Sequence, residues 1–318
     1  MEVLQIAPGE EAAVGDAELA LAIGNFDGVH RGHAAVLAQA REIAAERGLR
    51  TAVLTFEPHP RSVFRPDDPP FRLCLQPLKL RRLAAQGVER AIIAPFDARL
   101  SSLSPEAFAA FLAGLGAKAA VFGADFRFGK DRAGDAEALR RLGAAHGFET
   151  RAVSPVGAGE AKFSSSSVRR ALREGRPDAA ATVLGDWHCI EGPVEQGDQR
   201  GRDLGFPTAN QSLDGILHPR FGVYATRAEV LDGPHRGLYD AVSSLGMRPT
   251  FSKTIPNFET HLLDFKGDLY GAMLSVRLIA FLRPEISYDG VDPLIEQMRR
   301  DVIDAKAALA AAGDTPAL

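Results

Sequence analysis

The stretch that decides the fold of the N-terminal half is Leu21-Ala22-Ile23-Gly24-Asn25-Phe26-Asp27-Gly28-Val29-His30-Arg31-Gly32-His33. An apolar run ends at Gly24, and a helical pattern begins at about His33. This order predicts a buried parallel strand, a tight loop and the N-terminus of a helix. Backbone N–H groups and the helix dipole at such a junction suit a phosphate group, and His30 would add an imidazole beside that of His33. Gly32 would leave room for the phosphate to approach the backbone.

Strand and helix patterns alternate on both sides of this stretch. Strands are predicted at residues 19–24, 51–56, 91–94, 119–122 and 149–153, and helices at 33–47, from Ser104-Pro105-Glu106 onward, and at 135–146. This alternation indicates a doubly wound parallel sheet of the Rossmann-like α/β class. Ligands bind beyond the carboxyl ends of such strands, where the polar or glycine-rich loops 24–33, 57–61 and 123–130 are expected.

The pattern changes in the C-terminal part of the chain. After two short helices at 168–174 and 177–184, apolar segments at 188–190, 222–227, 240–244, 257–264 and 273–281 are separated by glycine and proline turns. Short strands at this spacing indicate a small antiparallel barrel or sandwich. A last helix at 292–309 carries an apolar face of Leu294, Ile295, Met298, Val302 and Ile303. We therefore expect two domains, residues 1–184 and 185–318.

Composition excludes several classes of protein. With a net charge of -4 over 318 residues and no basic block, the chain lacks the composition of a general nucleic-acid-binding protein. Cys74 and Cys189 alone make neither a disulfide framework nor a metal cluster. We find no signal-peptide core, no apolar run of membrane-spanning length and no Walker P-loop. These observations predict a cytoplasmic protein with no membrane or nucleic-acid partner.

Four segments of the N-terminal half carry a family resemblance. His30-Arg31-Gly32-His33 resembles the HxGH signature of nucleotidyltransferases. Together with Glu57-Pro58-His59-Pro60, the segment from Gly123 to Lys130 and Phe163-Ser164-Ser165-Ser166-Ser167-Val168-Arg169, it resembles the N-terminal module of bacterial bifunctional riboflavin kinase/FMN adenylyltransferases, also called FAD synthetases. The resemblance implies transfer of AMP from ATP to FMN with release of pyrophosphate. One departure is Ser166, where the family commonly has threonine.

The resemblance also implies roles for particular residues. His30 and His33 would be the catalytic hydrogen-bond donors that stabilise charge on the phosphates. The residues expected to bind nucleotide and phosphate are Gly24, Asn25, Phe26, Asp27, Ser164, Ser165, Ser166 and Arg169. Those expected to bind flavin are His59, Asp125, Phe126 and Phe128. From the residues alone, Asp125 could equally cap its loop, His59 could be a surface residue beside two prolines, and both phenylalanines could be core.

The C-terminal part contains a second set of motifs. A glycine-studded loop from Gly192 ends in Pro207-Thr208-Ala209-Asn210, where Thr208 and Asn210 would point to one side of an extended segment. Their oxygen atoms suit Mg²⁺. Further on lie Asn257-Phe258-Glu259-Thr260-His261 and Asp264-Phe265.

These motifs resemble the riboflavin kinase module of the same family, a six-stranded barrel with a C-terminal helix. The resemblance implies that Thr208 and Asn210 hold Mg²⁺ with ATP, and that Gly201, Gly205 and Pro207 contact the nucleotide. It makes Glu259 the catalytic base that takes a proton from the ribityl hydroxyl of riboflavin. The family often has histidine at Gln196 and an Asn-Ile pair at Ser244-Leu245, and we expect these departures to affect loop shape rather than the Thr208, Asn210 and Glu259 set.

The sequence thus predicts a bifunctional enzyme of FAD biosynthesis, with riboflavin, FMN and ATP as its small-molecule partners. It would act as a monomer or weak homo-oligomer. Two alternatives remain at this point. One is a nucleotidyltransferase for another substrate, such as a phosphosugar or nicotinamide mononucleotide, which leaves the barrel unexplained. The other makes the barrel a flavin-sensing or interaction module without catalysis, against which the joint presence of Thr208, Asn210 and Glu259 argues.

Overall fold

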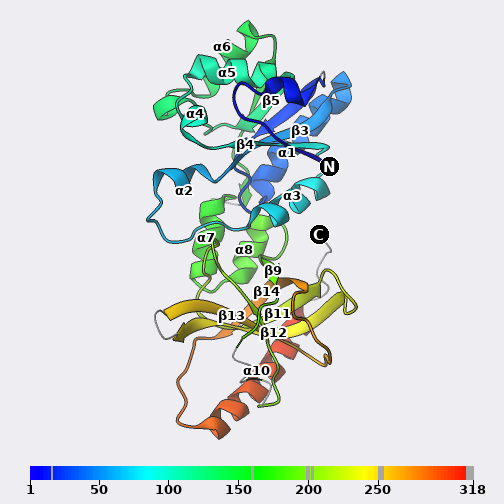
Figure 1. Cartoon of the computed structure of the whole chain (residues 1–318), viewed down its shortest axis with the longest axis vertical. Helices are drawn as coiled ribbons and strands as arrows, with labels where there is room; N and C mark the ends of the chain where they lie inside the picture. The colour runs from blue at the N-terminus through cyan, green and yellow to red at the C-terminus, as the bar shows by residue number, and fades with distance from the viewer. Residues whose placement is uncertain (16, 159–160, 198–200, 202–203, 250–253, 313–318) are drawn as a thin grey trace. The chain divides into compact units, whose positions relative to one another are not determined.

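The protein is described here from a computed structural model, which covers residues 1–312 except 16, 159–160, 198–200, 202–203 and 250–253 (Figure 1). The described chain divides into two compact units. The N-terminal unit comprises Met1–Asp68 and Gln76–Phe163, and the barrel unit comprises Pro69–Leu75 and the described chain from Ser164 onward. The domain boundary expected between residues 184 and 185 stays a prediction.

A parallel sheet of six strands forms the centre of the N-terminal unit, in the order β1-β4-β3-β2-β5-β6. All its neighbouring strands pair in parallel, which confirms the predicted fold class. The strands are β1 (Glu2–Gln5), β2 (Leu19–Ile23), β3 (Arg50–Glu57), β4 (Arg90–Pro95), β5 (Ala117–Gly123) and β6 (Glu149–Val153).

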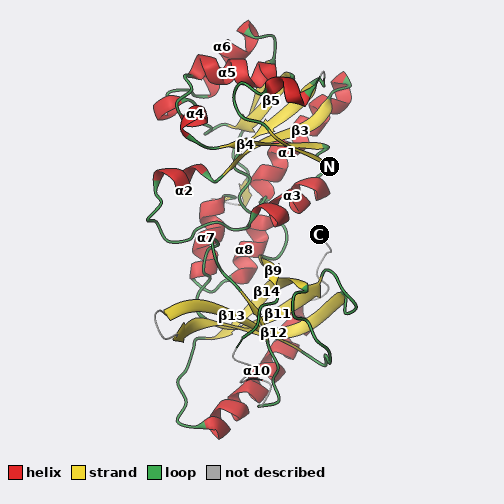
Figure 2. Ribbon diagram, viewed as in Figure 1, coloured by secondary structure: helices red, strands yellow, loops and turns green. Residues whose placement is uncertain are grey.

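Helices cover both faces of this sheet (Figure 2). Along β2, Leu19, Leu21 and Ile23 face one cluster with α5 (Pro105–Gly114) and α6 (Ala136–Ala145). The intervening alanines face a second cluster with α1 (Arg31–Arg47) and α3 (Gln76–Ala85). Because both faces are covered, β2 is apolar and buried along its whole length. The remaining short elements of this unit are η1 (Glu11–Val14), α2 (Pro60–Phe64), α4 (Ala98–Ser101), η2 (Lys130–Arg132), β7 (Gly157–Ala158) and β8 (Ala161–Lys162).

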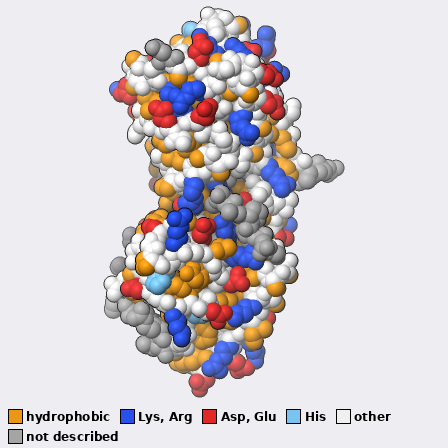
Figure 3. Space-filling view, turned by 90° about the vertical axis from the view of Figure 1, so that its right-hand side faces the viewer, with side chains coloured by type: hydrophobic (Ala, Val, Ile, Leu, Met, Phe, Trp, Pro, Cys, Tyr) orange, Lys and Arg blue, Asp and Glu red, His pale blue; other side chains and the backbone are white. Residues whose placement is uncertain are grey.

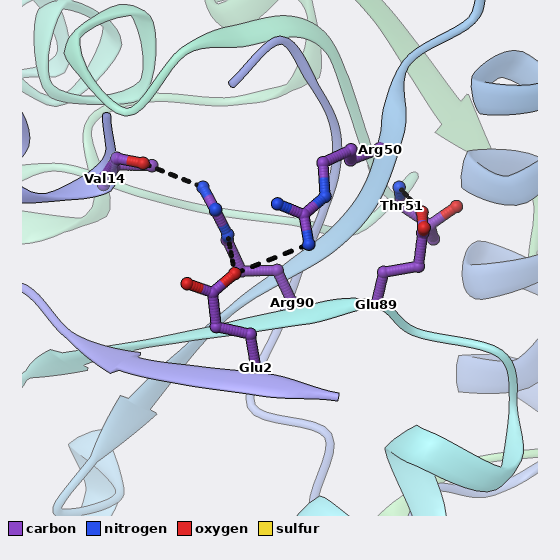
Figure 4. A network of polar contacts seen from close by, with 6 residues as sticks. All are labelled: Glu2, Val14, Arg50, Thr51, Glu89 and Arg90. Carbon is purple, nitrogen blue, oxygen red and sulfur yellow. Dashed lines mark hydrogen bonds and ion pairs between the residues drawn. The ribbon is translucent and has the colours of Figure 1, made fainter. Parts of the chain in front are cut away.

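The edge strand β1 is held by a network of charged side chains (Figure 4). The carboxylate of Glu2 accepts hydrogen bonds from Arg90 at 2.9 Å and from Arg50 at 3.4 Å. Arg90, whose side chain is only 7% exposed, also donates to the carbonyl of Val14 at 2.9 Å. One buried guanidinium therefore ties the edge strand and η1 to β4.

The barrel unit contains a six-stranded antiparallel sheet in the order β10-β13-β12-β11-β14-β9. Its two edge strands approach each other where the N–H of Glu195 donates to the carbonyl of Asn210 at 2.8 Å, so the sheet forms a nearly closed barrel. This confirms the predicted barrel. Its strands are β9 (Cys189–Pro193), β10 (Ala209–Gln211), β11 (Gly222–Val230), β12 (Gly237–Pro249), β13 (Thr254–Leu262) and β14 (Met273–Arg283).

Helices complete the described part of the barrel unit. Side chains of α7 (Ser165–Arg173) and α8 (Pro177–Leu184) join the apolar cluster of the barrel, through Val168, Leu172 and Leu184 among others. The long helix α10 (Val291–Ala312) lies against a separate cluster that includes Ala225 and Ile279.

The apolar face expected for the last helix was partly wrong. Its buried residues are Asp301, Ala305 and Leu309, whereas Ile303 is 67% exposed. Leu294, Ile295, Met298 and Val302 are half-buried. The buried face includes Ala305 and the paired carboxylate of Asp301. A pattern of large apolar side chains does not predict such a face.

Charges of both signs are interspersed over the face of the molecule seen in Figure 3. This distribution agrees with the net charge of -4 and the lack of a basic block in the sequence. Across the described residues, no helix combines the length and the apolar character needed to cross a bilayer.

Candidate functional sites

The N-terminal site lies at the point where the winding of the sheet reverses. Strand β2 has β3 on one side and β5 on the other. The connections after β2 and β3 cross one face through α1 and α3, whereas those after β4 and β5 cross the other face through α5 and α6. The loops that follow β2, β3 and β5 are at the carboxyl edge of the sheet, as predicted. Ligands of doubly wound sheets bind at such a switch point.

The loop after β2 has an unusual backbone. Phe26 and Val29 have φ angles of +49° and +45°, and Gly28 lies between them at +82°. The left-handed region is strained for bulky and β-branched side chains, at a cost of roughly 1–3 kcal/mol per residue. Such strain persists only where the surroundings fix the conformation, and it gathers at functional sites. Asn25 at the start of this loop is half-buried and Asp27 is buried.

His30 and His33 lie together at the start of α1. His30 is the N-cap of the helix, and its Nδ1 accepts a hydrogen bond from the backbone N–H of His33 at 3.3 Å. The two rings stack with 3.7 Å between centroids. Because Nδ1 of His30 is an acceptor, the proton of the neutral ring is on Nε2. His30 can therefore cap the helix and still present a donor to a ligand.

Gly32 is explained by packing. A Cβ atom there would come within 2.9 Å of the Phe163 carbonyl oxygen and 3.0 Å of the His30 ring. The absent side chain lets these groups approach α1, whereas the prediction from sequence was that this glycine leaves room for a phosphate. The guanidinium of Arg31 lies 5.8 Å from the centre of the Phe163 ring.

The loop after β5 presents an acid and one partly exposed aromatic ring. Asp125 pairs with Lys162 at 2.7 Å, and this hydrogen bond lowers the pKa of the Asp125 carboxyl. Phe128 is buried among core rings, and Phe126, half-buried, stacks on it with centroids 5.7 Å apart. After β3, His59 caps α2 by accepting from the N–H of Arg61 at 3.1 Å.

The serine run belongs to the barrel unit. Ser164 caps α7 by accepting from the N–H of Ser167 at 3.1 Å, and Ser165 and Ser166 begin the helix. The Nε of Arg169 donates to the carbonyl of Phe71 at 2.7 Å, and its guanidinium lies 5.3 Å from the centre of the Phe71 ring.

The predicted residues of the barrel site come together on neighbouring strands. Asn210 in β10 and Glu259 in β13 are cross-strand partners. Because residues directly opposite in an antiparallel pair share a face, their side chains are neighbours. Thr208, just before β10, donates from Oγ1 to Oε2 of Glu259 at 3.2 Å.

Glu259 is held by hydrogen bonds at both carboxylate oxygens. Besides Thr208, the side-chain amide of Asn257 donates to Oε1 at 2.6 Å. The pair of bonds fixes the direction of the carboxylate. Asn210 is buried, and within the described part of the chain its Oδ1 has no hydrogen-bond partner.

The glycines before the site allow the backbone to lie close to these side chains. A Cβ at Gly197 would come within 2.4 Å of the Asn210 amide, and one at Gly201 within 2.4 Å of the Phe206 carbonyl oxygen. Gly205 has a φ of +84°. Within the predicted loop, residues 198–200 and 202–203 lie outside the described residues. His261 Nδ1 contacts the carbonyl of Pro207 at 2.8 Å and steadies the segment before Thr208.

One expectation about family departures was wrong. Ser244 in β12 is the cross-strand partner of Glu259, so it stands in the same row of side chains as Asn210 and Glu259. The substitution at this position therefore adjoins the Thr208, Asn210 and Glu259 set and is not confined to loop shape.

Sequence reasoning missed several residues that hold these sites. Asn257 and His261 alternate with Glu259 along β13, a period-2 signal that could have identified them. Thr55 and Arg82, which contact the loop after β2, and Lys79, which contacts Thr55, gave no such signal.

Two family models match the chain. The model for FAD synthetase matches residues 14–167, and the model for riboflavin kinase matches residues 184–309. The first match includes both the HxGH stretch and the serine run, and the second includes Thr208, Asn210 and Glu259.

Similar proteins cover nearly the whole chain. A bifunctional riboflavin kinase/FMN adenylyltransferase from Listeria monocytogenes is 37% identical over 93% of this chain and 94% of its own. One from Escherichia coli is 39% identical over 90% of this chain and 91% of its own. A crystal structure named as a macrolide-efflux protein from Streptococcus pneumoniae matches with a TM-score of 0.84 and 30% identity, over 95% of this chain and 99% of that one.

Proposed function

The chain belongs to the family of bifunctional riboflavin kinase/FMN adenylyltransferases, and we propose that the two groups of side chains described above carry its two reactions. The C-terminal domain phosphorylates riboflavin to FMN with ATP. The N-terminal domain transfers AMP from ATP to FMN, which gives FAD and pyrophosphate. We place the domain boundary between residues 184 and 185.

In adenylyl transfer, a phosphate oxygen of FMN attacks the α-phosphorus of ATP, and the bond to the β-phosphate oxygen breaks. Negative charge develops on the α-phosphate and on the leaving pyrophosphate. His30 donates from Nε2 to this charge, and His33 adds a second imidazole. Support comes from the Nδ1 contact of His30, which leaves Nε2–H as the donor.

Our proposal assigns the remaining phosphate contacts to two further segments. The loop after β2 contributes Gly24, Asn25, Phe26 and Asp27. The N-terminus of α7 contributes Ser164, Ser165 and Ser166, with Arg169 adding positive charge. The Ser164 hydroxyl caps α7 in the structure.

The flavin would lie beside the loops after β3 and β5, near His59, Asp125, Phe126 and Phe128. Of the two rings, Phe126 is the one with exposed surface, so it would contact the isoalloxazine while Phe128 supports it from the core. An aromatic pair of this kind contributes about 0.5–1.5 kcal/mol beyond the burial of its area.

In the barrel, Glu259 acts as the general base. It accepts the proton of the ribityl 5′-hydroxyl while that oxygen attacks the γ-phosphorus of ATP and the bond to ADP breaks. Thr208 and Asn257 aim the carboxylate. Gly201, Gly205 and Pro207 bring the backbone against the nucleotide.

The residues present fit a magnesium ion. The Asn210 Oδ1 is a buried acceptor that lacks a partner among the described residues, and Thr208 keeps acceptor capacity on Oγ1 because it donates its proton to Glu259. Neutral oxygen ligands with phosphate oxygens are what Mg²⁺ takes in phosphoryl-transfer sites. When bound there, the ion would neutralise charge on the transferred phosphate.

We also propose the substrates, the cellular compartment and the oligomeric state of the enzyme. Its partners are riboflavin, FMN and ATP, and it works in the cytoplasm as a monomer or weak homo-oligomer. The mixed surface charge supports the absence of nucleic-acid and membrane partners.

The observation that carries the barrel assignment is the contact of Thr208 with a carboxylate whose cross-strand partner is Asn210. The test is Glu259→Gln, which keeps size but removes the base. Riboflavin phosphorylation should fall by about 100-fold or more. Supplied FMN should still become FAD.

The matched control is Asp240→Asn, because Asp240 is an exposed strand carboxylate of the same barrel. It should change either activity by no more than about twofold. If Glu259→Gln phosphorylates riboflavin as fast as this control, Glu259 is not the base.

A further inference from the structure

Helix α3 carries two buried cationic side chains that are linked by hydrogen bonds to the loop before His30. Lys79 is 3% exposed and Arg82 is 5% exposed, and they lie one turn apart on the helix. Long cationic side chains are seldom buried to this extent unless specific partners compensate for lost hydration. Their partners therefore indicate what these charges do.

Arg82 contacts the backbone of the loop after β2 directly, and Lys79 is linked to it through Thr55. The Nη1 of Arg82 donates to the carbonyl oxygen of Gly28 at 3.0 Å. The Nζ of Lys79 donates to Oγ1 of Thr55 at 3.2 Å, and that hydroxyl in turn donates to the carbonyl oxygen of Asn25 at 3.2 Å. Lys79 is also held by the carboxylate of Glu57 at 3.4 Å. The carbonyls that directly precede the strained residues Phe26 and Val29 are thus both fixed from α3, the first through Thr55.

We infer that Arg82, and Lys79 acting through Thr55, are positioning residues for adenylyl transfer. They hold the carbonyls of Asn25 and Gly28, the residues directly before Phe26 and Val29, and so keep these two residues in their left-handed conformations. In a trans peptide the carbonyl and the next N–H point in opposite directions. Drawing the Asn25 carbonyl toward Thr55 therefore turns the N–H of Phe26 away from β3.

The consequence for His30 follows from its place in the chain. It comes directly after Val29, so the direction in which the loop enters α1 sets where its imidazole lies. This inference rests on the proposed role of His30. Lys79 and Arg82 act through that loop and are not required to touch a substrate.

The experiment compares three variants of the full-length enzyme. Arg82→Met removes the donor to Gly28, and Thr55→Val removes the hydroxyl but leaves Lys79 paired with Glu57. The control is Arg41→Met, because Arg41 also donates to a backbone carbonyl, that of Gln86 at 3.2 Å, but on an exposed surface. Each protein is assayed for FAD formation from FMN and for FMN formation from riboflavin, and amide hydrogen exchange is followed peptide by peptide.

In Arg82→Met and Thr55→Val, kcat for FAD formation should fall by about tenfold or more, since small displacements of catalytic groups have effects of this size. The KM for ATP should change less. Exchange should quicken over residues 24–30 and not in β4 or β5. Riboflavin phosphorylation should stay at the wild-type rate, and Arg41→Met should match wild type throughout.

Two results would overturn the inference. One is FAD formation at the control rate in both variants. The other is loss of FAD formation with faster exchange throughout the sheet, which indicates a general structural role. If Arg82→Met does not fold, Thr55→Val decides by the same criteria. A His30→Asn enzyme that forms FAD normally would instead overturn the proposed function itself.

Discussion

His30 combines a structural and a proposed chemical role in one side chain. Its Nδ1 caps α1, and its Nε2 is the donor assigned to the phosphates. An alanine substitution would remove both at once. Asparagine is among the best N-cap residues but has no imidazole, so it can separate the two roles.

We therefore expect His30→Asn to keep the melting temperature of the wild type. FAD formation from FMN should fall by about 100-fold, as for loss of a donor to developing negative charge. Riboflavin phosphorylation measured on the same preparation should be unchanged. Equal loss of both activities would show that the residue is needed only for folding.

His218 in the barrel unit gives the protein a predictable response to acid. Burial lowers the pKa of this imidazole, and the nearby Asp214 opposes the shift only in part. The unfolded state therefore takes up the proton first as the pH falls through the ordinary histidine pKa of about 6.5. Stability is lost over that range and further below it, until the folded protein is protonated too.

The melting temperature of the wild type should accordingly fall between pH 7.5 and pH 5.5. In His218→Gln, which cannot take up a proton there, the fall should be smaller. An identical pH dependence for the two proteins would mean that His218 does not contribute.

At this scale the sequence identifies residues whose chemistry is local. His30 and His33 are predicted where a loop meets the N-terminus of a helix, which is where the structure has them, and Glu259 stands in a recognisable strand. It does not tell which of Phe126 and Phe128 faces the core, because that depends on α5. Nor does it single out Lys79 and Arg82, since burial of a cation depends on elements distant in sequence.

At the scale of elements, a partly buried ion pair ties α10 to the barrel. Arg283 at the end of β14 binds Asp301 through two bonds of 2.8 and 2.6 Å, and Gln297 also donates to this carboxylate. Asp301 is buried, and Arg283 is partly exposed. The geometry is bidentate, which is the strong form of this interaction.

Asp301→Ala should therefore destabilise the barrel unit by about 2–3 kcal/mol, below the roughly 3–5 kcal/mol for one partner of a fully buried pair. The control is Glu296→Gln on the same helix, whose partner Arg300 is as exposed as it is. Glu296→Gln should change the free energy of unfolding by no more than about 0.5 kcal/mol. Denaturant unfolding of both variants measures the difference, and similar losses would contradict the assigned importance of Asp301.

The elements predicted from sequence were those with a clear period and sufficient length. Helix α8 was predicted at its observed bounds, and Ser104 and Pro105 marked the start of α5. Strand β10 has three residues, too few for a period to show. Strand β1 is a mostly exposed edge strand, held by Arg90 rather than by an apolar pattern.

At the scale of the whole molecule, the packing of α7 and α8 affects which residue should begin a kinase fragment that folds independently. Their side chains Val168, Leu172, Ala180 and Leu184 lie in the apolar cluster of the barrel. Each buried leucine or valine contributes about 1.5–3 kcal/mol.

We expect a fragment of residues 164–318 to melt at a higher temperature than one of residues 185–318. Both should phosphorylate riboflavin if they fold, because Thr208, Asn210 and Glu259 are present in each. Equal melting temperatures would support the predicted boundary between residues 184 and 185 as the structural one as well.

The central claim is that two independent sites on one chain carry the two reactions. The most direct test incubates His30→Asn and Glu259→Gln enzymes with riboflavin, ATP and Mg²⁺, each alone and then mixed, and separates the flavins by chromatography. We expect His30→Asn alone to accumulate FMN, Glu259→Gln alone to leave riboflavin unchanged, and the mixture to produce FAD. A mixture that accumulates FMN but forms no FAD would contradict the claim.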